Sequence, residues 1–344
     1  MILHIFPLEK FTEPFFRFGK ENFRNFSSRH FFYIYGNSKK FKNPEGDNVL
    51  NSEKIVHLKR YFLLIKKMNS AEKIIIHGLW GFCILVLLAI QPWLLKKCYW
   101  AIWGGDIYIY RDGIKDSKWH IREFFRRIAI KKMGHFITHV QGDYELAQEW
   151  YGAGGVWHEC FMYPSNLYSE IPEKKSAHRG VNILLGNSAD SSNNHLDALD
   201  KLSIYDDQDI AIFCPLSYGN FEYGKEVADY GKEKFNKKFN PIFNFFSIED
   251  YLLLLSKIDI AIFNHQRQQG MGNIINLLGF EKKIFMNSET TSYQMLKNLG
   301  LYIFSLDELS LEKLNSQQAF HNKEIIKNYF SKQQLARRWE MIYE

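Results

Sequence analysis

The chain has 344 residues, of which 46% are hydrophobic and 24% are charged. This length suggests about two domains, and the composition lets each bury a core, which excludes an intrinsically disordered chain. The four cysteines lack C-x-x-C spacing, which excludes a disulfide framework and favours a reducing compartment. No basic segment precedes a short apolar core at the start of the sequence, so we expect no signal peptide.

Apolar, β-rich runs alternate with amphipathic runs along the whole chain. In the first half, the predicted strands cover residues 3–6, 31–35, 73–77, 98–103, 135–138 and 156–162. In the second half they cover residues 182–186, 210–214, 258–263, 283–286 and 301–304. Helices are predicted over residues 117–131, 193–201, 221–235, 248–256 and 272–279. This alternation predicts an α/β fold of parallel sheets with helices on both faces.

The basic residues are unevenly placed within a net charge of +6. One set runs from Arg17 to Lys67 and is interleaved with aromatic residues, and a second runs from Lys115 to Lys132. A basic, aromatic-rich face fits an anionic membrane surface or an anionic ligand. The alternative is that the aromatic residues belong to the core and the lysines to a solvated face. No nucleic-acid-binding motif is present, so nucleic acid is not an expected partner.

One apolar run, residues 79–95, approaches transmembrane length. It is interrupted by Gly81, Gln91 and Pro92, so the pattern favours a buried helix of about 12 residues over a membrane span.

A polar stretch with two prolines, residues 164–180, separates the two series of strands and is the predicted linker. The resulting domains are residues 1–165 and 181–320, with a C-terminal helix over 321–344 that could pack back on the first domain. Two doubly wound domains facing each other would form a cleft, because ligands of such sheets bind beyond the carboxyl ends of the strands.

Two polar turns in the second half follow predicted strands. The first contains Gly186, Asn187, Ser188 and Asn193, and it leads into a helix whose N-terminus would suit a phosphate. An ordinary helix cap is the alternative. The second turn contains the positively charged Arg267 and glycines that let the backbone approach a ligand, and its candidate residues are Arg267, Gln269, Gly270, Gly272 and Asn273. Tyr218, beside Gly219, marks a further strand exit toward the same place.

A third group of polar residues lies at two strand ends of the first half. His77 and Asp106 are the candidate catalytic residues, the carboxylate as a general base and the imidazole to orient a sugar or assist proton transfer. Around them are the candidate acceptor-binding residues Gly78, Trp103, Gly105 and Tyr108. A purely structural role for either catalytic candidate is the alternative.

Several chemistries lack their motifs. The histidines lack ligand spacing, so no metal site is expected. The absence of G-x-S-x-G, P-loop and G-x-G-x-x-G sequences weakens hydrolase, kinase and dehydrogenase interpretations.

Taken together, three motifs resemble glycosyltransferase family 56, the family of the TDP-N-acetylfucosamine:lipid II N-acetylfucosaminyltransferase. They are Trp103 to Tyr108, Leu185 to Ser188 with Asp190 and Asn193 to His195, and Arg267 to Gly272, over a resemblance spanning residues 73–300. The resemblance implies a GT-B fold with an acceptor-binding first domain and a nucleotide-sugar-binding second domain. It also implies a metal-independent enzyme at the cytoplasmic face of the bacterial inner membrane, acting on a polyprenyl-diphosphate-linked saccharide.

We therefore expect transfer of a deoxy or acetamido sugar, such as that of TDP-N-acetylfucosamine, to a lipid-linked acceptor. The polysaccharide could be enterobacterial common antigen, an O-antigen or a capsule, because the stretch 36–68 and the C-terminal tail match nothing in the family. The alternatives are a GT-B-like sugar-nucleotide epimerase, which would need no acceptor, and a non-catalytic sugar-binding protein.

Overall fold

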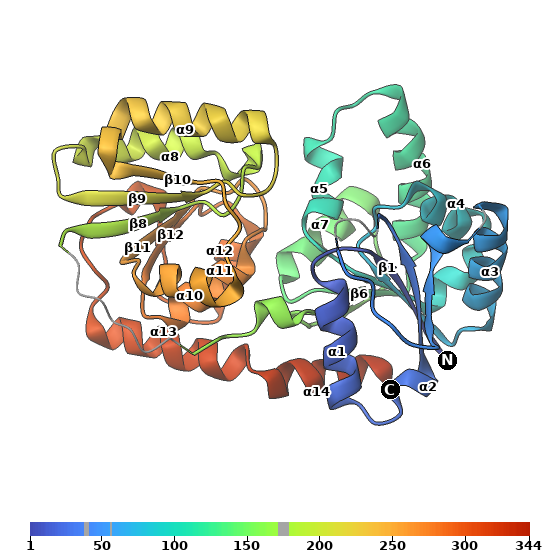
Figure 1. The fold of residues 1–344 in the computed structure, drawn as a ribbon. Coiled ribbons are helices and arrows are strands. Elements are labelled where there is room, and N and C mark those ends of the chain that lie inside the picture. Colours follow the sequence, from blue (N-terminus) through green and yellow to red (C-terminus); the bar gives the residue numbers. More distant parts are fainter. Residues whose placement is uncertain (38–40, 56, 171–178) are drawn as a thin grey trace. The chain divides into compact units, whose positions relative to one another are not determined.

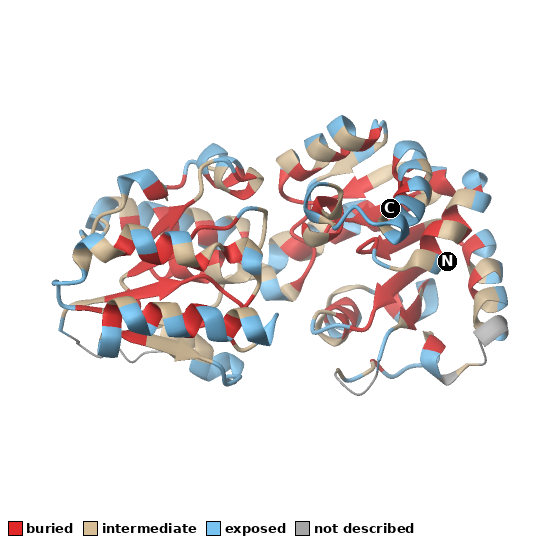
Figure 2. Ribbon diagram, turned by 90° about the horizontal axis from the view of Figure 1, so that it is seen from above, coloured by how far each residue is buried: buried red, intermediate tan, exposed pale blue. Residues whose placement is uncertain are grey.

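The computed structural model describes residues 1–37, 41–55, 57–170 and 179–344. The chain divides into two compact units, Met1–Ser165 with Lys332–Glu344, and Asn166–Ser331. Each unit contains one parallel sheet with helices on both sides (Figure 1). Buried residues gather along the strands and on the inner sides of the helices (Figure 2). The α/β fold predicted from the sequence is confirmed.

The sheet of the first unit has the strand order β3-β2-β1-β4-β5-β6-β7. Its strands are β1 (Ile2–Pro7), β2 (His30–Tyr35), β3 (Val49–Asn51), β4 (Lys73–His77), β5 (Cys98–Ala101), β6 (His135–Ile137) and β7 (Val156–His158). The chain winds outward from β1 through β2 to β3 and then returns to add β4 on the other side of β1. The strand order therefore reverses between β1 and β4, where doubly wound sheets bind ligands.

Alternate residues of the strands face two different layers. On one face, Leu3, Ile5, Ile74 and Ile76 join the core formed with three helices, α3 (His57–Ser70), α4 (Phe82–Ile90) and α6 (Ser117–Lys132). On the other face, the His77 ring packs against aromatic rings of α1 (Thr12–Asn22) and α14 (Lys332–Tyr343). The remaining helices of this unit are α2 (Phe26–Arg29), α5 (Gly105–Asp112) and α7 (Gln141–Tyr151).

The aromatic residues of the first basic stretch belong mainly to the core. The side chains of Phe15, Phe16, Phe18 and Phe26 are all at most 4% exposed. The structure therefore supports the core alternative for this stretch, because packing against β1 and β2 removes these rings from any membrane-facing surface.

The apolar run 79–95 contains a short buried helix. Helix α4 ends at Ile90, and a 3₁₀ helix, η2 (Pro92–Lys97), follows it because Pro92 cannot continue an α-helix. Across the described part of the chain, no helix has the length and apolarity that a membrane span requires.

The sheet of the second unit has the order β10-β9-β8-β11-β12-β13. Its strands are β8 (Val181–Leu185), β9 (Ile210–Pro215), β10 (Phe239–Ile242), β11 (Ile260–Phe263), β12 (Lys283–Met286) and β13 (Phe304–Ser305). Its helices are α8 (His195–Leu202), α9 (Phe221–Phe235), α10 (Ile248–Ser256), α11 (Met271–Gly279), α12 (Thr291–Asn298) and α13 (Ser316–Tyr329). Strands β3 and β10 were not predicted, since both are short strands at sheet edges.

The C-terminal region differs from the single helix expected over 321–344. It contains two helices, with α13 ending at Tyr329 in the second unit and α14 beginning at Lys332 in the first. Trp339 anchors α14, because its indole is fully buried and its Nε1 donates to the Met162 carbonyl at 2.7 Å. The chain therefore crosses between the units twice.

Candidate functional site

The second unit brings its two polar turns together at one edge of its sheet. Strands β8 and β11 are neighbours, and the strand order reverses between them. Gly186 follows β8, and the turn from Asn264 to Gly270 follows β11. Both turns leave the carboxyl ends of adjacent parallel strands, so they lie at the position where ligands of doubly wound sheets bind.

Two glycines allow the backbone to pass close to this cluster. Gly186 and Gly270 have φ angles of +66° and +69°, which L residues with side chains rarely adopt. A Cβ atom on Gly186 would lie 2.5 Å from Nε2 of His195. A Cβ atom on Gly270 would lie 3.1 Å from Cε1 of His265. Glycine is therefore needed at both positions for conformation and for space.

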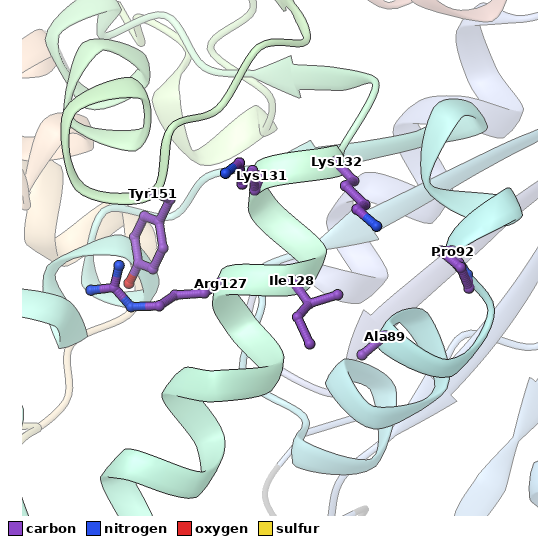
Figure 3. A pocket seen from close by; sticks show the side chains of 7 residues that line it. All are labelled: Ala89, Pro92, Arg127, Ile128, Lys131, Lys132 and Tyr151. Carbon is purple, nitrogen blue, oxygen red and sulfur yellow. The ribbon is translucent and has the colours of Figure 1, made fainter.

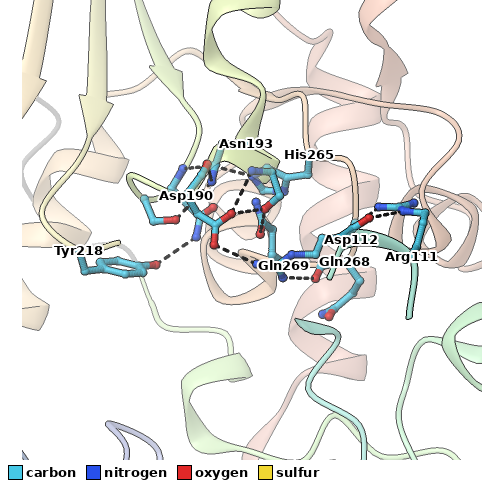
Figure 4. Close-up of polar contacts among 12 residues, drawn as sticks. Arg111, Asp112, Asp190, Asn193, Tyr218, His265, Gln268 and Gln269 are labelled. Carbon is cyan, nitrogen blue, oxygen red and sulfur yellow. Dashed lines mark hydrogen bonds and ion pairs between the residues drawn. The ribbon is translucent and has the colours of Figure 1, made fainter. Parts of the chain in front are cut away.

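Asn193 connects the two turns. Its Oδ1 accepts from the backbone N–H of Asn187 at 2.9 Å and lies 3.1 Å from Nε2 of His265, which follows β11 (Figure 4). Its Nδ2 donates to Oγ of Ser188 at 3.3 Å. Asn193 is 1% exposed, so this amide holds the network from inside rather than offering itself to a ligand.

Arg267 and Asp190 provide the charges of the site. The guanidinium Nη2 lies 3.2 Å from Oδ2 of Asp190, and the two side chains are 18% and 42% exposed. Burial by itself raises the pKa of Asp190, but hydrogen bonds from Ser192 and the nearby Arg267 outweigh it and lower that pKa. An anionic ligand that binds Arg267 would therefore have to compete with a carboxylate already in place.

The histidines of this cluster are neutral. Burial lowers the pKa of His265 to about 3 and that of His195 to about 4. Among the buried polar atoms of this cluster without a hydrogen-bond partner in the described residues are Oδ1 of Asn187 and Nε2 of Gln269, and also Nε2 of His195 and Nδ1 of His265. Unpaired buried polar atoms are costly, so a ligand group that reached Asn187 or Gln269 would gain from bonding to them.

The remaining donor-site candidates lie around the same turns. Gly272 and Asn273 are in the first turn of α11, whose N-cap, Gly270, makes no side-chain capping bond, so the first amides of this helix are suited to a phosphate. Nδ2 of Asn273 donates to the Tyr251 hydroxyl at 2.8 Å, which holds α11 against α10. Tyr218 is 42% exposed, and its hydroxyl accepts from Nδ2 of Asn187 at 3.0 Å.

In the first unit, Asp106 is fully buried and holds the exits of two strands. Its Oδ2 accepts from the Leu79 backbone N–H at 2.8 Å and from Nε1 of Trp100 at 2.7 Å. Its Oδ1 accepts from the Trp103 backbone N–H at 2.9 Å. Burial raises the pKa of Asp106, although these hydrogen bonds oppose the shift. This geometry favours a positioning role and leaves the predicted role as general base without an open path to a substrate.

His77 is also buried and belongs to a chain of hydrogen bonds. Its Nδ1 lies 2.7 Å from the Tyr163 hydroxyl, and its Nε2 lies 3.0 Å from Nδ1 of His4. Nε2 of His4 lies 2.9 Å from Nδ1 of His30. Trp103 donates through Nε1 to the Tyr163 hydroxyl at 2.7 Å.

The Trp103 donor at one end of this chain is compatible with a single direction for all of its bonds. Because the Tyr163 hydroxyl accepts from Trp103, its own proton is free to go to Nδ1 of His77. Burial lowers the pKa values of His77, His4 and His30, so all three are neutral and carry one ring proton each. In that arrangement the ring proton is on Nε2 of His77, which donates to His4, and on Nε2 of His4, which donates to His30; the opposite tautomers reverse both bonds.

The predicted acceptor residues do not all reach the sheet edge. Gly78 and Trp103 lie at the carboxyl ends of β4 and β5, and Gly105 is the first residue of α5. Tyr108 is 4% exposed and packs edge-on against the Trp150 ring within the core. The prediction that Tyr108 binds the acceptor is therefore not supported, because α5 turns this side chain inward.

The structure adds Glu9 as a candidate residue for which the sequence predicted no role. It follows β1 at the edge where the strand order reverses beside β4, and its side chain is exposed. A carboxylate just after the first buried strand was a usable signal, but its importance depends on β4 being the neighbour of β1. Over the ranges that the structure describes, no cluster of three or more His, Cys, Asp or Glu side chains is arranged to hold a metal ion.

Three solved structures, two of them of glycosyltransferases, share this fold over nearly the whole chain. WaaG, a glycosyltransferase involved in lipopolysaccharide biosynthesis, matches with a TM-score of 0.64 and 12% identity, over 100% of this chain and 98% of its own. Alr3699/HepE of Anabaena, in complex with UDP and glucose, matches with a TM-score of 0.69 and 12% identity, over 99% of both chains. A glycosyltransferase of Rickettsia africae matches with a TM-score of 0.63 and 15% identity, over 99% and 97%.

Two doubly wound parallel sheets, each with one reversal of strand order, together with these structural matches, define the GT-B fold. The family model described as 4-alpha-L-fucosyltransferase, glycosyl transferase group 56, matches residues 24–343. The chain belongs to this family. The resemblance seen in the motifs is confirmed and extends to both sides of the stretch 73–300.

Proposed function

We propose that this glycosyltransferase moves a deoxy or acetamido sugar from a TDP-sugar, such as TDP-N-acetylfucosamine, to a polyprenyl-diphosphate-linked saccharide. The reaction would serve bacterial surface polysaccharide synthesis at the cytoplasmic face of the inner membrane. One observation carries the donor half of this proposal: the turns containing Gly186 and Gly270 meet at the edge between β8 and β11. The family description supports a fucosyl-type sugar.

In this proposal the donor diphosphate lies against the first turn of α11, with Arg267 as its cation. The amides of the helix N-terminus and the guanidinium would stabilise the charge that grows on the leaving nucleotide diphosphate. Arg267 would exchange part of its contact with Asp190 for the phosphate oxygens. The unpaired atoms of Asn187 and Gln269 would bind hydroxyl or amide groups of the donor.

For the acceptor half, we propose Glu9 as the group that takes the proton from the acceptor hydroxyl. It is an exposed carboxylate at the strand-order reversal of the first sheet, whereas the carboxylate of Asp106 is already used by three scaffold donors. Asp106 and His77 would then position Trp103 and the exits of β4 and β5.

Titration calorimetry with TDP-, UDP- and GDP-sugars tests the donor site. The proposal expects the tightest binding for a TDP-sugar, and it expects mass spectrometry to detect a glycosylated polyprenyl-diphosphate saccharide only when the acceptor is present. Product formed from the nucleotide sugar alone would support the epimerase alternative instead. Glu9→Gln should lower turnover strongly and leave donor affinity unchanged, with the partly exposed Glu13→Gln on α1 as the matched control.

A further inference from the structure

Helix α6 buries one ion pair and exposes two large apolar side chains, which is unusual for a surface helix. Glu123 and Arg126 are 3% and 2% exposed, and Oε2 of Glu123 lies 3.3 Å from Nη1 of Arg126. On the outer side, Ile121 and Phe124 are 55% and 61% exposed. Exposing these side chains while burying an ion pair has no folding advantage within this chain, so the outer side of α6 suits a partner.

The end of α4 and the start of η2 continue this exposed apolar surface. Ile90 and Trp93 are 58% and 63% exposed. A shallow groove of about 570 Å³ joins the two elements, with Ala89 and Pro92 on one side and Arg127, Ile128, Lys131 and Lys132 of α6 on the other (Figure 3). We call the surface formed by Ile90, Trp93, Ile121, Phe124, Lys131 and Lys132 the α4–α6 face.

The charge of this face has one sign. The stretches 82–97 and 117–132 contain two and six Lys or Arg residues, and their only acidic residue is Glu123. That carboxylate is buried and paired with Arg126 and Arg127, at 3.3 and 3.5 Å. Lys131 and Lys132 are exposed at the end of α6 beside the groove. The outward charge of both stretches is therefore positive.

We propose that the α4–α6 face binds the anionic headgroups of a lipid bilayer, with Trp93 and Phe124 entering the interface and the lysines contacting phosphate. Exposed aromatic and aliphatic side chains flanked by lysines are the combination that an anionic membrane surface recognises. A second copy of the chain would bring the same positive face and would be repelled. This inference rests on the proposed membrane location and identifies the surface responsible for it.

Co-sedimentation of the full chain with vesicles tests the proposal. Vesicles of phosphatidylglycerol and phosphatidylethanolamine should bind the protein, and vesicles of phosphatidylcholine should bind it much more weakly. Lys131→Gln with Lys132→Gln should lower binding by about tenfold or more at low salt. Trp93→Ala with Phe124→Ala should lower binding at both low and high salt. The matched controls on the second unit, Lys232→Gln with Lys237→Gln and Phe245→Ala, should bind like the wild type.

Melting temperature and donor affinity, measured on the same variants, separate a lost surface from a lost fold. If both variants of the α4–α6 face bound vesicles as tightly as the wild type, the proposal that this face binds the membrane would be wrong. Failure of the wild type to bind anionic vesicles would overturn it too, and would favour an acidic protein as the partner. Vesicle binding as expected would support the membrane-binding face even if the protein transferred no sugar to a lipid-linked saccharide in detergent. The absence of transfer would reject the proposed function alone.

Discussion

A Cβ atom on Gly270 would lie 3.2 Å from Cγ of Asn187, so the turns after β11 and β8 are in contact with no room for a side chain between them. The two residues are far apart in the sequence and meet only because β8 and β11 are neighbours. This contact defines the floor of the proposed donor site, and the first two predictions test that site.

Gly270→Ala should weaken donor binding well beyond its cost to stability. The left-handed backbone at this position costs an alanine about 1–2 kcal/mol, and the new methyl group would displace Asn187 or His265. Gly300→Ala is the matched control: its φ is +82°, and a Cβ there would meet only Cδ1 of Ile325, at 3.8 Å. Calorimetric titration should show reduced donor affinity for the first variant alone. Equal donor affinity in both would contradict the placement of the site.

Arg267→Gln should reduce donor affinity by about 10- to 100-fold, because a charge-assisted hydrogen bond to phosphate would be lost. Its ion pair with Asp190 is partly exposed, so unfolding free energy should fall by less than about 1 kcal/mol. Lys313→Gln, which removes a pair with Asp259 at 2.8 Å, is the control for losing a cation from this unit. If the arginine variant binds the donor normally, the diphosphate lies elsewhere.

Asp106→Asn should destabilise the first unit by about 2–3 kcal/mol. An amide in place of the carboxylate presents an NH₂ group to at least one of the three donors that now bond to Asp106. Thermal unfolding measures the effect, with Asp112→Asn on the same helix as an exposed control. An unchanged melting temperature combined with lost turnover would instead support the catalytic role that the sequence predicts for Asp106.

Acidification should destabilise the first unit through its buried histidines. Burial lowers the pKa of His30 to about 3 and that of His4 and His77 in the same direction, so the unfolded chain binds protons below about pH 6.5 that the folded chain excludes. Stability therefore falls as pH decreases, by up to about 1.4 kcal/mol per pH unit for each histidine.

Urea unfolding at pH 7.5, 6.5 and 5.5, with the slope compared between variants, checks this prediction of a pH dependence. His30→Gln should lower the slope of the unfolding free energy against pH by the amount that corresponds to about one bound proton. The exposed His120→Gln should leave it unchanged. A slope that does not respond to His30→Gln would mean that this histidine is protonated in the folded protein, and the neutral state assigned to it would then be wrong.

Local patterns in the sequence determined the elements of this protein and its fold class. Helices α9 and α10 begin and end where their amphipathic patterns do, and the apolar run Lys73–His77 is a strand as predicted. Glycines after apolar runs marked the turns at Gly186 and Gly270. These features follow from side-chain periodicity and backbone preference. Both depend on residues that are close together in the sequence, so the sequence alone predicts them.

Only the tertiary structure decided which strands are neighbours and which polar side chains remain accessible. The pairing of β1 with β4 gives Glu9 its position, and the three scaffold donors around Asp106 bury a carboxylate that the sequence could equally have placed in solvent. Packing also decided which side chains of α6 are accessible, because it buries Glu123 and leaves Phe124 exposed. Burial and strand order depend on contacts between residues far apart in the chain, and local periodicity carries no information about them.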